Sequence, residues 1–345
     1  MHFSIFLTRI KLMVLLVHLL FLAGCTTWKL GSSGQKKISG KTYVIIGASS
    51  GFGQGVAKEL GRCRANVVLA ARRTDLLEAI ADTIRSEGGT AMVVTTDISK
   101  PEDVQRVADE ALKKYPKIDV WINMAGIAAI GRFWEIPPED DARIIDVNLK
   151  GFLYGSKAAL KQFIKQGQGV LINMGSVESE IPLAYQTSYA ASKAGVRSIS
   201  LSLSQELRLN GYKNIKIVTI EPWAADTPLW RHAANYSGVE PKMALMDEPC
   251  KIVNAVLRKS LRPKKMVPVG WKAQGASFFA NVLPRFSEWF SGNLSQKYQM
   301  EMGPAAVNTQ GSIYRPMPEG RGVDDGADKR MKQNRKERRD KNNKE

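Results

Sequence analysis

Cysteine and histidine are scarce in this chain of 345 residues, which contains three of each. Cys25, Cys63 and Cys250 lie far apart in the sequence. They lack both the paired spacing of a zinc site and the density of a disulfide framework. We therefore expect neither a metal site nor a disulfide scaffold.

Acidic residues are few relative to basic ones, 33 against 50, and the net charge is +17. Such an excess is typical of proteins that contact nucleic acids or anionic membranes. Residues 328–345 alone carry nine Lys or Arg and four Asp or Glu, with almost no apolar side chains. We expect a disordered basic tail over 326–345. No base-reading motif accompanies it, so we predict no specific nucleic-acid partner.

An acidic residue is missing after the second expected strand, where many dinucleotide sites need one, although the turn after the first expected strand is typical of such a site. The expected strand 42–46 leads into a glycine-rich turn and a helix over 54–60, an arrangement that binds a pyrophosphate at the helix N-terminus. The turn residues predicted to bind the cofactor are Gly47, Ser49, Ser50, Gly51, Phe52 and Gly53.

The second expected strand, 66–70, ends without the carboxylate that would hold the ribose 2′-hydroxyl of NAD(H). Ala71 stands there instead, followed by Arg72 and Arg73. Two cations suit a 2′-phosphate, so we predict NADP(H) in preference to NAD(H). The alternative is that both arginines are surface residues opening the helix near Thr74.

The rest of the sequence to about residue 270 alternates strands with helices. Strands are expected over 91–96, 119–123, 170–174, 215–220 and 266–269, and helices over 102–115, 140–166 and 187–210. This alternation predicts an α/β fold with a parallel sheet covered on both faces. Ligands of such sheets bind at the carboxyl ends of the strands.

Tyr189 and Lys193 are four residues apart in the last of these helices, so they share one helix face. A pair of this kind is common and usually structural. Three companions point to chemistry instead. Ser176 follows the expected strand 170–174, Asn148 lies in the expected helical region 140–166, and Asn123 ends the expected strand 119–123.

With these motifs in order, the chain resembles the short-chain dehydrogenase/reductase family over about residues 38–270. The resemblance implies a doubly wound Rossmann-type sheet in a single catalytic domain, 41–270, which often forms homo-oligomers. It assigns Asn148, Ser176, Tyr189 and Lys193 to the catalytic set. It also adds further cofactor-binding residues: Asp97 beside the adenine, Asn123 near the cofactor ribose, and Ala125, Gly126, Pro222 and Thr227. Tyr189 and Lys193 belong to the cofactor-binding residues as well. Two positions depart from the family pattern: Ile46 replaces a Thr and Trp223 replaces a Gly.

These residues predict an oxidoreductase that moves hydride between a nicotinamide and a carbonyl or alcohol. Tyr189 would act as general acid or base, with its pKa lowered by the Lys193 ammonium and by the oxidised nicotinamide. Ser176 would donate to the substrate oxygen, and Asn148 would hold a water beside Lys193. The alternative is a non-catalytic dinucleotide-binding or sensor protein on the same fold, which the intact catalytic set argues against.

Apolar and aromatic residues are frequent in the loop 223–246 and predict an apolar small-molecule substrate. Beyond it, residues 271–325 form an extension. We expect two amphipathic helices there, 276–283 and 286–294, followed by an extended strap around residues 314–318. The helices have three candidate roles: packing on the domain, forming a dimer surface, or lying on a bilayer.

The N-terminal residues 1–29 are expected to form a signal or anchor segment. Arg9 and Lys11 precede an apolar run, 12–23, that is shorter than the roughly 20 residues of a membrane-spanning helix. The run ends in Leu-Ala-Gly before Cys25, which resembles a bacterial lipobox and favours export with a lipid anchor on Cys25. An uncleaved apolar anchor and a later start at Met13 are the alternatives.

Basic residues in 29–41, part of which we interpret as a polar linker (30–40), favour a cytoplasmic domain. The predicted cofactor does too. We therefore expect a membrane-associated protein whose catalytic domain is cytoplasmic.

Overall fold

The computed structural model describes residues 30–243, 245–327, 330 and 333. Within this part, seven parallel strands form one sheet in the order β3-β2-β1-β4-β6-β7-β9, and a separate small pairing joins β5 (Ala129–Ile130) to β8 (Ala234–Asn235). The strand order reverses between β1 and β4, which places a crevice at their carboxyl ends. The strands of the large sheet are β1 (Thr42–Ile46), β2 (Asn66–Ala71), β3 (Thr90–Thr95), β4 (Val120–Asn123), β6 (Gly169–Met174), β7 (Ile215–Pro222) and β9 (Met266–Val269).

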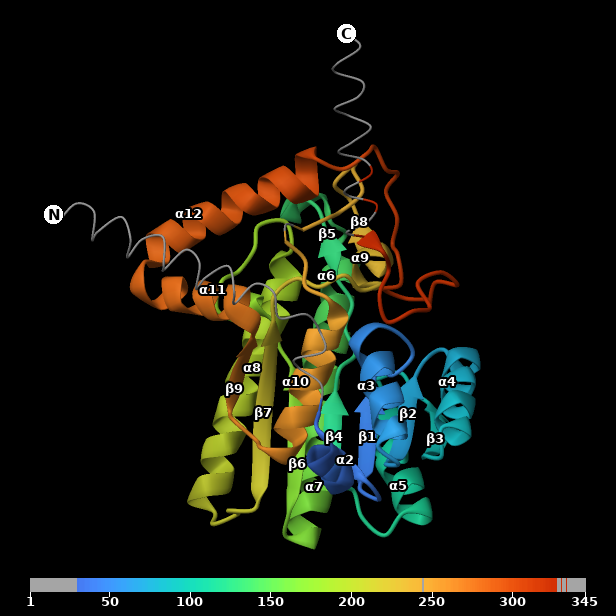
Figure 1. The fold of residues 1–345 in the computed structure, drawn as a ribbon. Coiled ribbons are helices and arrows are strands. Elements are labelled where there is room, and N and C mark those ends of the chain that lie inside the picture. Colours follow the sequence, from blue (N-terminus) through green and yellow to red (C-terminus); the bar gives the residue numbers. More distant parts are fainter. Residues whose placement is uncertain (1–29, 244, 328–329, 331–332, 334–345) are drawn as a thin grey trace, which may run out of the picture.

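Helices cover both faces of this sheet (Figure 1). One layer contains α3 (Gly51–Arg62), α4 (Thr74–Ser86) and α10 (Pro249–Leu261), and the other contains α5 (Pro101–Lys114), α6 (Pro138–Ile145), α7 (Gly151–Gln166) and α8 (Thr187–Leu209). The Rossmann-type α/β fold expected from the sequence is therefore confirmed.

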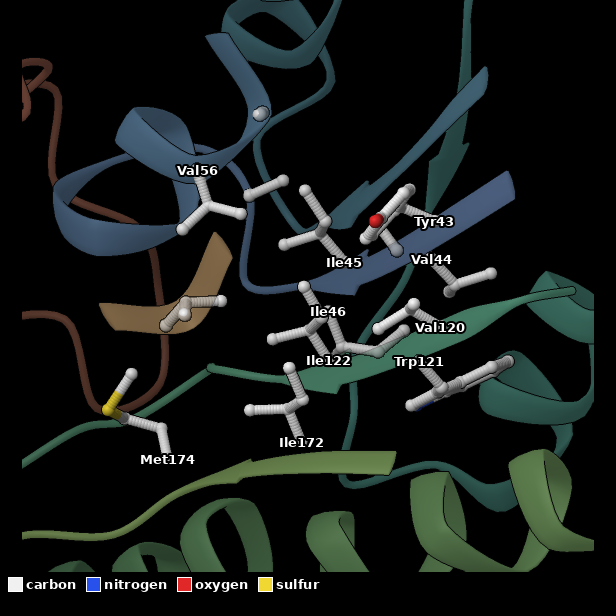
Figure 2. Packing of buried hydrophobic residues seen from close by; sticks show 14 of the residues in the cluster. Tyr43, Val44, Ile45, Ile46, Val56, Val120, Trp121, Ile122, Ile172 and Met174 are labelled. Atoms are coloured by element: carbon white, nitrogen blue, oxygen red, sulfur yellow. The ribbon is translucent and has the colours of Figure 1, made fainter. Parts of the chain in front are cut away.

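The core lies between the central strands and the two helix layers (Figure 2). All five residues of β1 are buried, and its Ile45 pairs in register with Ile122 of β4, which pairs with Ile172 of β6. Trp121 is the largest fully buried side chain. A parallel sheet covered on both faces needs such continuous apolar runs rather than alternating ones.

The expected polar linker over residues 30–40 contains a helix instead, α2 (Ser32–Ile38). Its last residue, Ile38, is fully buried in the main core, and α2 packs against α10. The interpretation as a linker was wrong. It rested on the polar composition of 30–40, which arises because most of this short helix faces solvent while one side chain, Ile38, anchors it.

The extension after β9 begins with two consecutive helices, α11 (Gly270–Val282) and α12 (Pro284–Ser295), as expected. The π-helical segment η5 (Gln296–Glu301) follows, and then the strap, by which we mean residues 303–327. The expected anchor segment 1–29 and nearly all of the expected tail lie outside the described residues. Among those described, no helix combines the length and apolarity needed to cross a bilayer.

Replacing Ile38 with Ala tests whether α2 is part of the folded domain. Removing a fully buried Ile should lower the free energy of unfolding by about 2 to 5 kcal/mol, because a cavity is left behind. The exposed neighbour provides a control: Lys36→Ala should change stability by no more than about 0.5 kcal/mol. Denaturant unfolding of both variants measures the difference, and equal small effects would mean that 30–40 is a linker after all.

Candidate active site

The glycine-rich turn lies where β1 comes closest to β4. Gly47 has a φ of +95°, and a Cβ added to it would stand 2.5 Å from the backbone nitrogen of Ala125. A Cβ on Gly53 would collide with the Gly47 carbonyl oxygen. The N-cap residue of α3, Ser50, makes no side-chain cap, so the N–H groups of the first turn are not capped by their own helix.

A cavity of about 190 Å³ extends from this turn along the carboxyl ends of the strands. Fifteen of the sixteen residues predicted to bind the cofactor line it, which makes it the candidate dinucleotide site. They are Gly47, Ser49, Ser50, Gly51, Phe52, Gly53, Arg72, Arg73, Asp97, Ala125, Gly126, Tyr189, Lys193, Pro222 and Thr227.

Asn123 is the exception, because its side chain faces the interior. It is fully buried, accepts from the Trp121 indole at 2.8 Å, and donates to Asn173 at 2.9 Å. A role beside the cofactor therefore stays a prediction for this residue, and the geometry favours a structural one. The residues that follow it, 124–127, line the cavity.

Asp97, expected beside the adenine, lies at the cavity edge. It accepts from the backbone and hydroxyl of Ser99 and from Arg143 at 2.7 Å. Burial raises the pKa of the Asp97 carboxyl, but these hydrogen bonds outweigh it and hold the pKa below its ordinary value.

The two arginines after β2 are engaged by the protein itself. Arg72 donates to the carbonyl oxygens of Ser312 at 2.8 Å and Tyr314 at 3.0 Å, both in the strap. Arg73 donates to the hydroxyls of Ser49 at 3.0 Å and Ser50 at 2.6 Å, within the phosphate-binding turn.

The strap crosses the mouth of the cavity. The Gly322 carbonyl accepts from the backbone N–H of Gly51 at 2.9 Å, and Asp325 pairs with Arg231 at 2.9 Å. Its residues Ser312, Pro316 and Met317 line the cavity. The sequence predicted an extended strap but not its contacts, because no local pattern encodes which carbonyls an arginine will meet.

Lys193 and Tyr189 lie together at the inner end of the cavity. The buried ammonium of Lys193 donates to the Met174 carbonyl at 2.9 Å and stands 5.5 Å from the centre of the Tyr189 ring. Burial lowers the pKa of Lys193 to about 8, although the nearby Glu178 opposes the shift. The i, i+4 spacing thus brings the two side chains to one point, as the sequence predicted.

Asn148 lies in a π-helical segment, η3 (Asp146–Lys150), between α6 and α7. Its side chain accepts from the Ile127 N–H at 2.9 Å and donates to the Ile127 carbonyl at 2.8 Å. It also donates to Ser192 at 3.2 Å. These bonds use the side-chain amide of Asn148 and hold η3 beside Lys193. A water bound at Asn148 stays a prediction. Single-turn π-helices are frequent at functional sites.

Ser176 lines a second, mainly apolar pocket with Leu183, Trp230 and Met243. Tyr189 lines both this pocket and the dinucleotide cavity, so it stands at their junction. Ser176 also begins a short turn, accepting from the Glu178 N–H at 3.1 Å.

Glu178 was missed by the sequence reasoning, because a lone acid after a strand gives no signal. It is buried in the wall of the apolar pocket, and within the described chain its Oε2 atom has no hydrogen-bond partner. Burial raises the pKa of Glu178 to about 8, with Lys193 opposing. Burial also raises the pKa of the Tyr189 phenol well above its ordinary value; Glu178 adds to that rise and a Ser176 hydrogen bond opposes it.

The protein groups alone therefore do not lower the Tyr189 pKa as the sequence led us to expect. Lys193 is not among the causes of its shift, and its ammonium faces the Met174 carbonyl instead.

Comparisons with known proteins agree with this geometry. The model of the short chain dehydrogenase family matches residues 41–236. The chain is 29% identical to YxnA, an uncharacterized oxidoreductase of Bacillus subtilis, over 81% of this chain and 79% of that protein. It is 35% identical to 3beta-hydroxysteroid dehydrogenase 1 of Eggerthella lenta, over 60% of this chain and 78% of that one.

Among solved structures, a short-chain dehydrogenase of Sphingobium yanoikuyae in complex with NADPH superimposes with a TM-score of 0.61 at 28% identity, covering 72% of this chain and 96% of that one. Other structures of similar fold were solved with NADP or with NADH. The match over more than half of the chain, together with a dinucleotide cavity that meets the Tyr–Lys–Ser–Asn set, shows that the chain belongs to the short-chain dehydrogenase/reductase family and is an NAD(P)-dependent oxidoreductase.

Proposed function

We propose that this protein is an NADP(H)-dependent reductase or dehydrogenase in which Tyr189 exchanges a proton with a carbonyl or alcohol oxygen. The observation that carries the proposal is the position of Tyr189 at the junction of the dinucleotide cavity and the apolar pocket. A group at that junction contacts both reactants of a hydride transfer.

The residues around the Gly47–Gly53 turn would hold the dinucleotide, whose nicotinamide would supply or accept the hydride at the substrate carbon. In the reducing direction the Tyr189 hydroxyl gives its proton to the substrate oxygen, and in the oxidising direction the phenolate takes it back. Ser176, beside it in the pocket wall, donates a hydrogen bond to the same oxygen and stabilises the charge that develops there.

Lys193 returns a proton to this site. Because burial brings its pKa to about 8, the ammonium is poised to release a proton near neutral pH, while its bond to the Met174 carbonyl fixes its direction. Asn148 acts indirectly on this site, by holding the backbone of Ile127 in place. The intact set favours this function over a non-catalytic sensor.

The preference for NADP(H) rests on Ala71, Arg72 and Arg73 at the end of β2. Arg73 is the better partner for a 2′-phosphate, because it already lies beside Ser49 and Ser50 in the phosphate-binding turn. Arg72 lines the same cavity but also holds the strap. An apolar substrate, the second part of the proposal, is supported by the Leu, Met and Trp side chains that line the pocket beside Ser176.

Tyr189→Phe should reduce turnover to background while the dissociation constant for NADPH changes little, because the ring that lines the cavity is kept and only the hydroxyl is lost. Steady-state turnover across ketones, aldehydes and quinones, with NADPH binding followed by fluorescence, separates the two effects. Wild-type turnover in the variant would refute the assignment.

Arg73→Ala should lower kcat/KM for NADPH by about 10- to 100-fold, the loss expected for a charge-assisted contact with phosphate, and leave that for NADH nearly unchanged. Lys161→Ala, an exposed cation on α7, is the control. Equal wild-type efficiency with both cofactors would remove the basis for the NADP(H) preference.

As the pH rises from about 4.5 to about 8, the free energy of unfolding of the wild-type protein should fall relative to that of the Glu178→Gln variant. In this window the unfolded chain ionises Glu178, with its ordinary pKa of 4.5, while the folded chain keeps it protonated. Folding therefore binds a proton, which favours the native state at low pH only. Melting temperatures of the two proteins from pH 5 to pH 8 measure this trend. Glu206→Gln, an exposed control, should show none.

A further inference from the structure

The amphipathicity of α12 is inverted. Its inward side consists of Ser287, Ser291 and Ser295, all buried, whereas Phe286 and Phe290 are each 49% exposed and Trp289 is 63% exposed. A helix that packs its side on a soluble domain buries its aromatic residues and exposes its serines. The aromatic side of α12 therefore needs a partner outside the domain.

The same exposed side continues onto α11. The rings of Phe278, Phe279, Phe286 and Phe290 form a chain of contacts, with neighbouring centroids 5.7 to 6.4 Å apart, and Phe278 is 61% exposed. We call this continuous apolar side of α11 and α12 the aromatic face. Figure 1 shows the two helices as a hairpin at one edge of the molecule. Contiguous exposed apolar surface of this kind marks an interaction site.

A basic groove lies next to the base of the hairpin. It occupies about 900 Å³ between α2, α10 and β9, and it reaches Gly270 and Gln274 in the first turns of α11. No carboxylate is among its lining residues, whereas its cations are Lys37, Arg258, Lys259, Arg262 and Lys264. Such a groove complements anionic headgroups.

The first described residues of the chain lie in this groove. Leu30, the first described residue, lines the groove, and residues 12–23 precede it by only a short stretch of sequence. The cationic groove and the aromatic face thus adjoin at α11, and in the sequence the apolar run precedes the groove. Their shared chemistry is that of a lipid bilayer with negatively charged headgroups.

We propose that the α11–α12 hairpin docks on an anionic phospholipid bilayer, with the aromatic face in the interfacial region and the basic groove against the headgroups. The indole of Trp289 suits that depth because it has an apolar body and a polar N–H, and the phenylalanine rings suit the apolar side of a helix that lies in the interface. A second copy of the chain is the competing occupant. It would bring another cationic groove close to this one, and like charges oppose such an association.

The test uses the full chain with Leu16→Asp and Leu20→Asp, so that the N-terminal run no longer contributes apolar binding. This reference chain should float with vesicles of phosphatidylethanolamine and phosphatidylglycerol. Adding Phe278→Ser, Phe286→Ser and Trp289→Ser should weaken that binding by at least about tenfold, because three interfacial side chains are lost. Leu209→Ser, at an exposed position on α8, is the matched apolar control and should not weaken it.

A charge arm tests the groove. Lys259→Glu with Arg262→Glu should remove the preference for phosphatidylglycerol over phosphatidylcholine vesicles, whereas Lys161→Glu on α7 should not. Peptide-resolved hydrogen exchange of the reference chain should show added protection in 270–295 when vesicles are present. This readout does not depend on any hairpin variant being folded.

Three results would overturn the proposal. The first is equal vesicle binding by the reference chain and a folded hairpin variant. The second is no binding and no added protection in the reference chain. The third is a reference chain that is dimeric in sedimentation and does not bind vesicles, with a monomeric hairpin variant, which would make the aromatic face an interface between copies.

Discussion

The close approach of two backbones, at Gly47 and Ala125, is the constraint on which the rest of the site depends. No side chain fits between them, so the phosphate-binding turn after β1 sits directly against the segment that follows β4. That segment is short and in turn meets the catalytic residues: a Cβ on Gly126 would stand 3.8 Å from the Asn148 amide oxygen and 3.9 Å from the Lys193 ammonium. One stretch of backbone therefore joins the dinucleotide cradle to the proton-transfer groups.

This arrangement explains why the structural side chains near the site are polar. Asn123 ties β4 to β6 through Asn173, which in turn donates to Ser200 of α8 at 3.0 Å. Asn148 also holds the backbone of Ile127, four residues after Asn123, through hydrogen bonds to its N–H and carbonyl. In a buried setting such a chain of satisfied hydrogen bonds is rigid, because breaking any one bond leaves a desolvated group unpaired. The carbonyl that orients Lys193 belongs to Met174, directly after Asn173, so the network also fixes the ammonium.

How far the sequence predicted the site depends on whether each residue acts locally. Glycines, and a Tyr and Lys four apart, act through backbone geometry and helix periodicity, so their placement could be predicted. Asn123 could not be placed by its motif alone, because which way its side chain turns depends on Trp121 and on a strand 50 residues away. Glu178 gave no signal at all, since its shifted pKa comes from burial by distant elements. The linker interpretation of 30–40 failed because a single apolar residue, Ile38, decided the outcome.

The strap could not be placed from the sequence either, because it is held by polar contacts with Arg72, Gly51 and Arg231 as well as by the buried Ile313. The hairpin before it is also held by polar contacts, and these are incomplete. Within the described chain, the Ser295 hydroxyl at the end of α12 and both amide atoms of Gln299, in the η5 segment that continues it, are buried without hydrogen-bond partners, each at a cost of about 1 to 3 kcal/mol. A hairpin with an under-satisfied polar inner side and an apolar outer side gains little from its own domain. Its position is therefore best stabilised by whatever covers its aromatic rings, and that contact would set the orientation of the adjoining pocket wall, because α11 packs against the turn that carries Glu178.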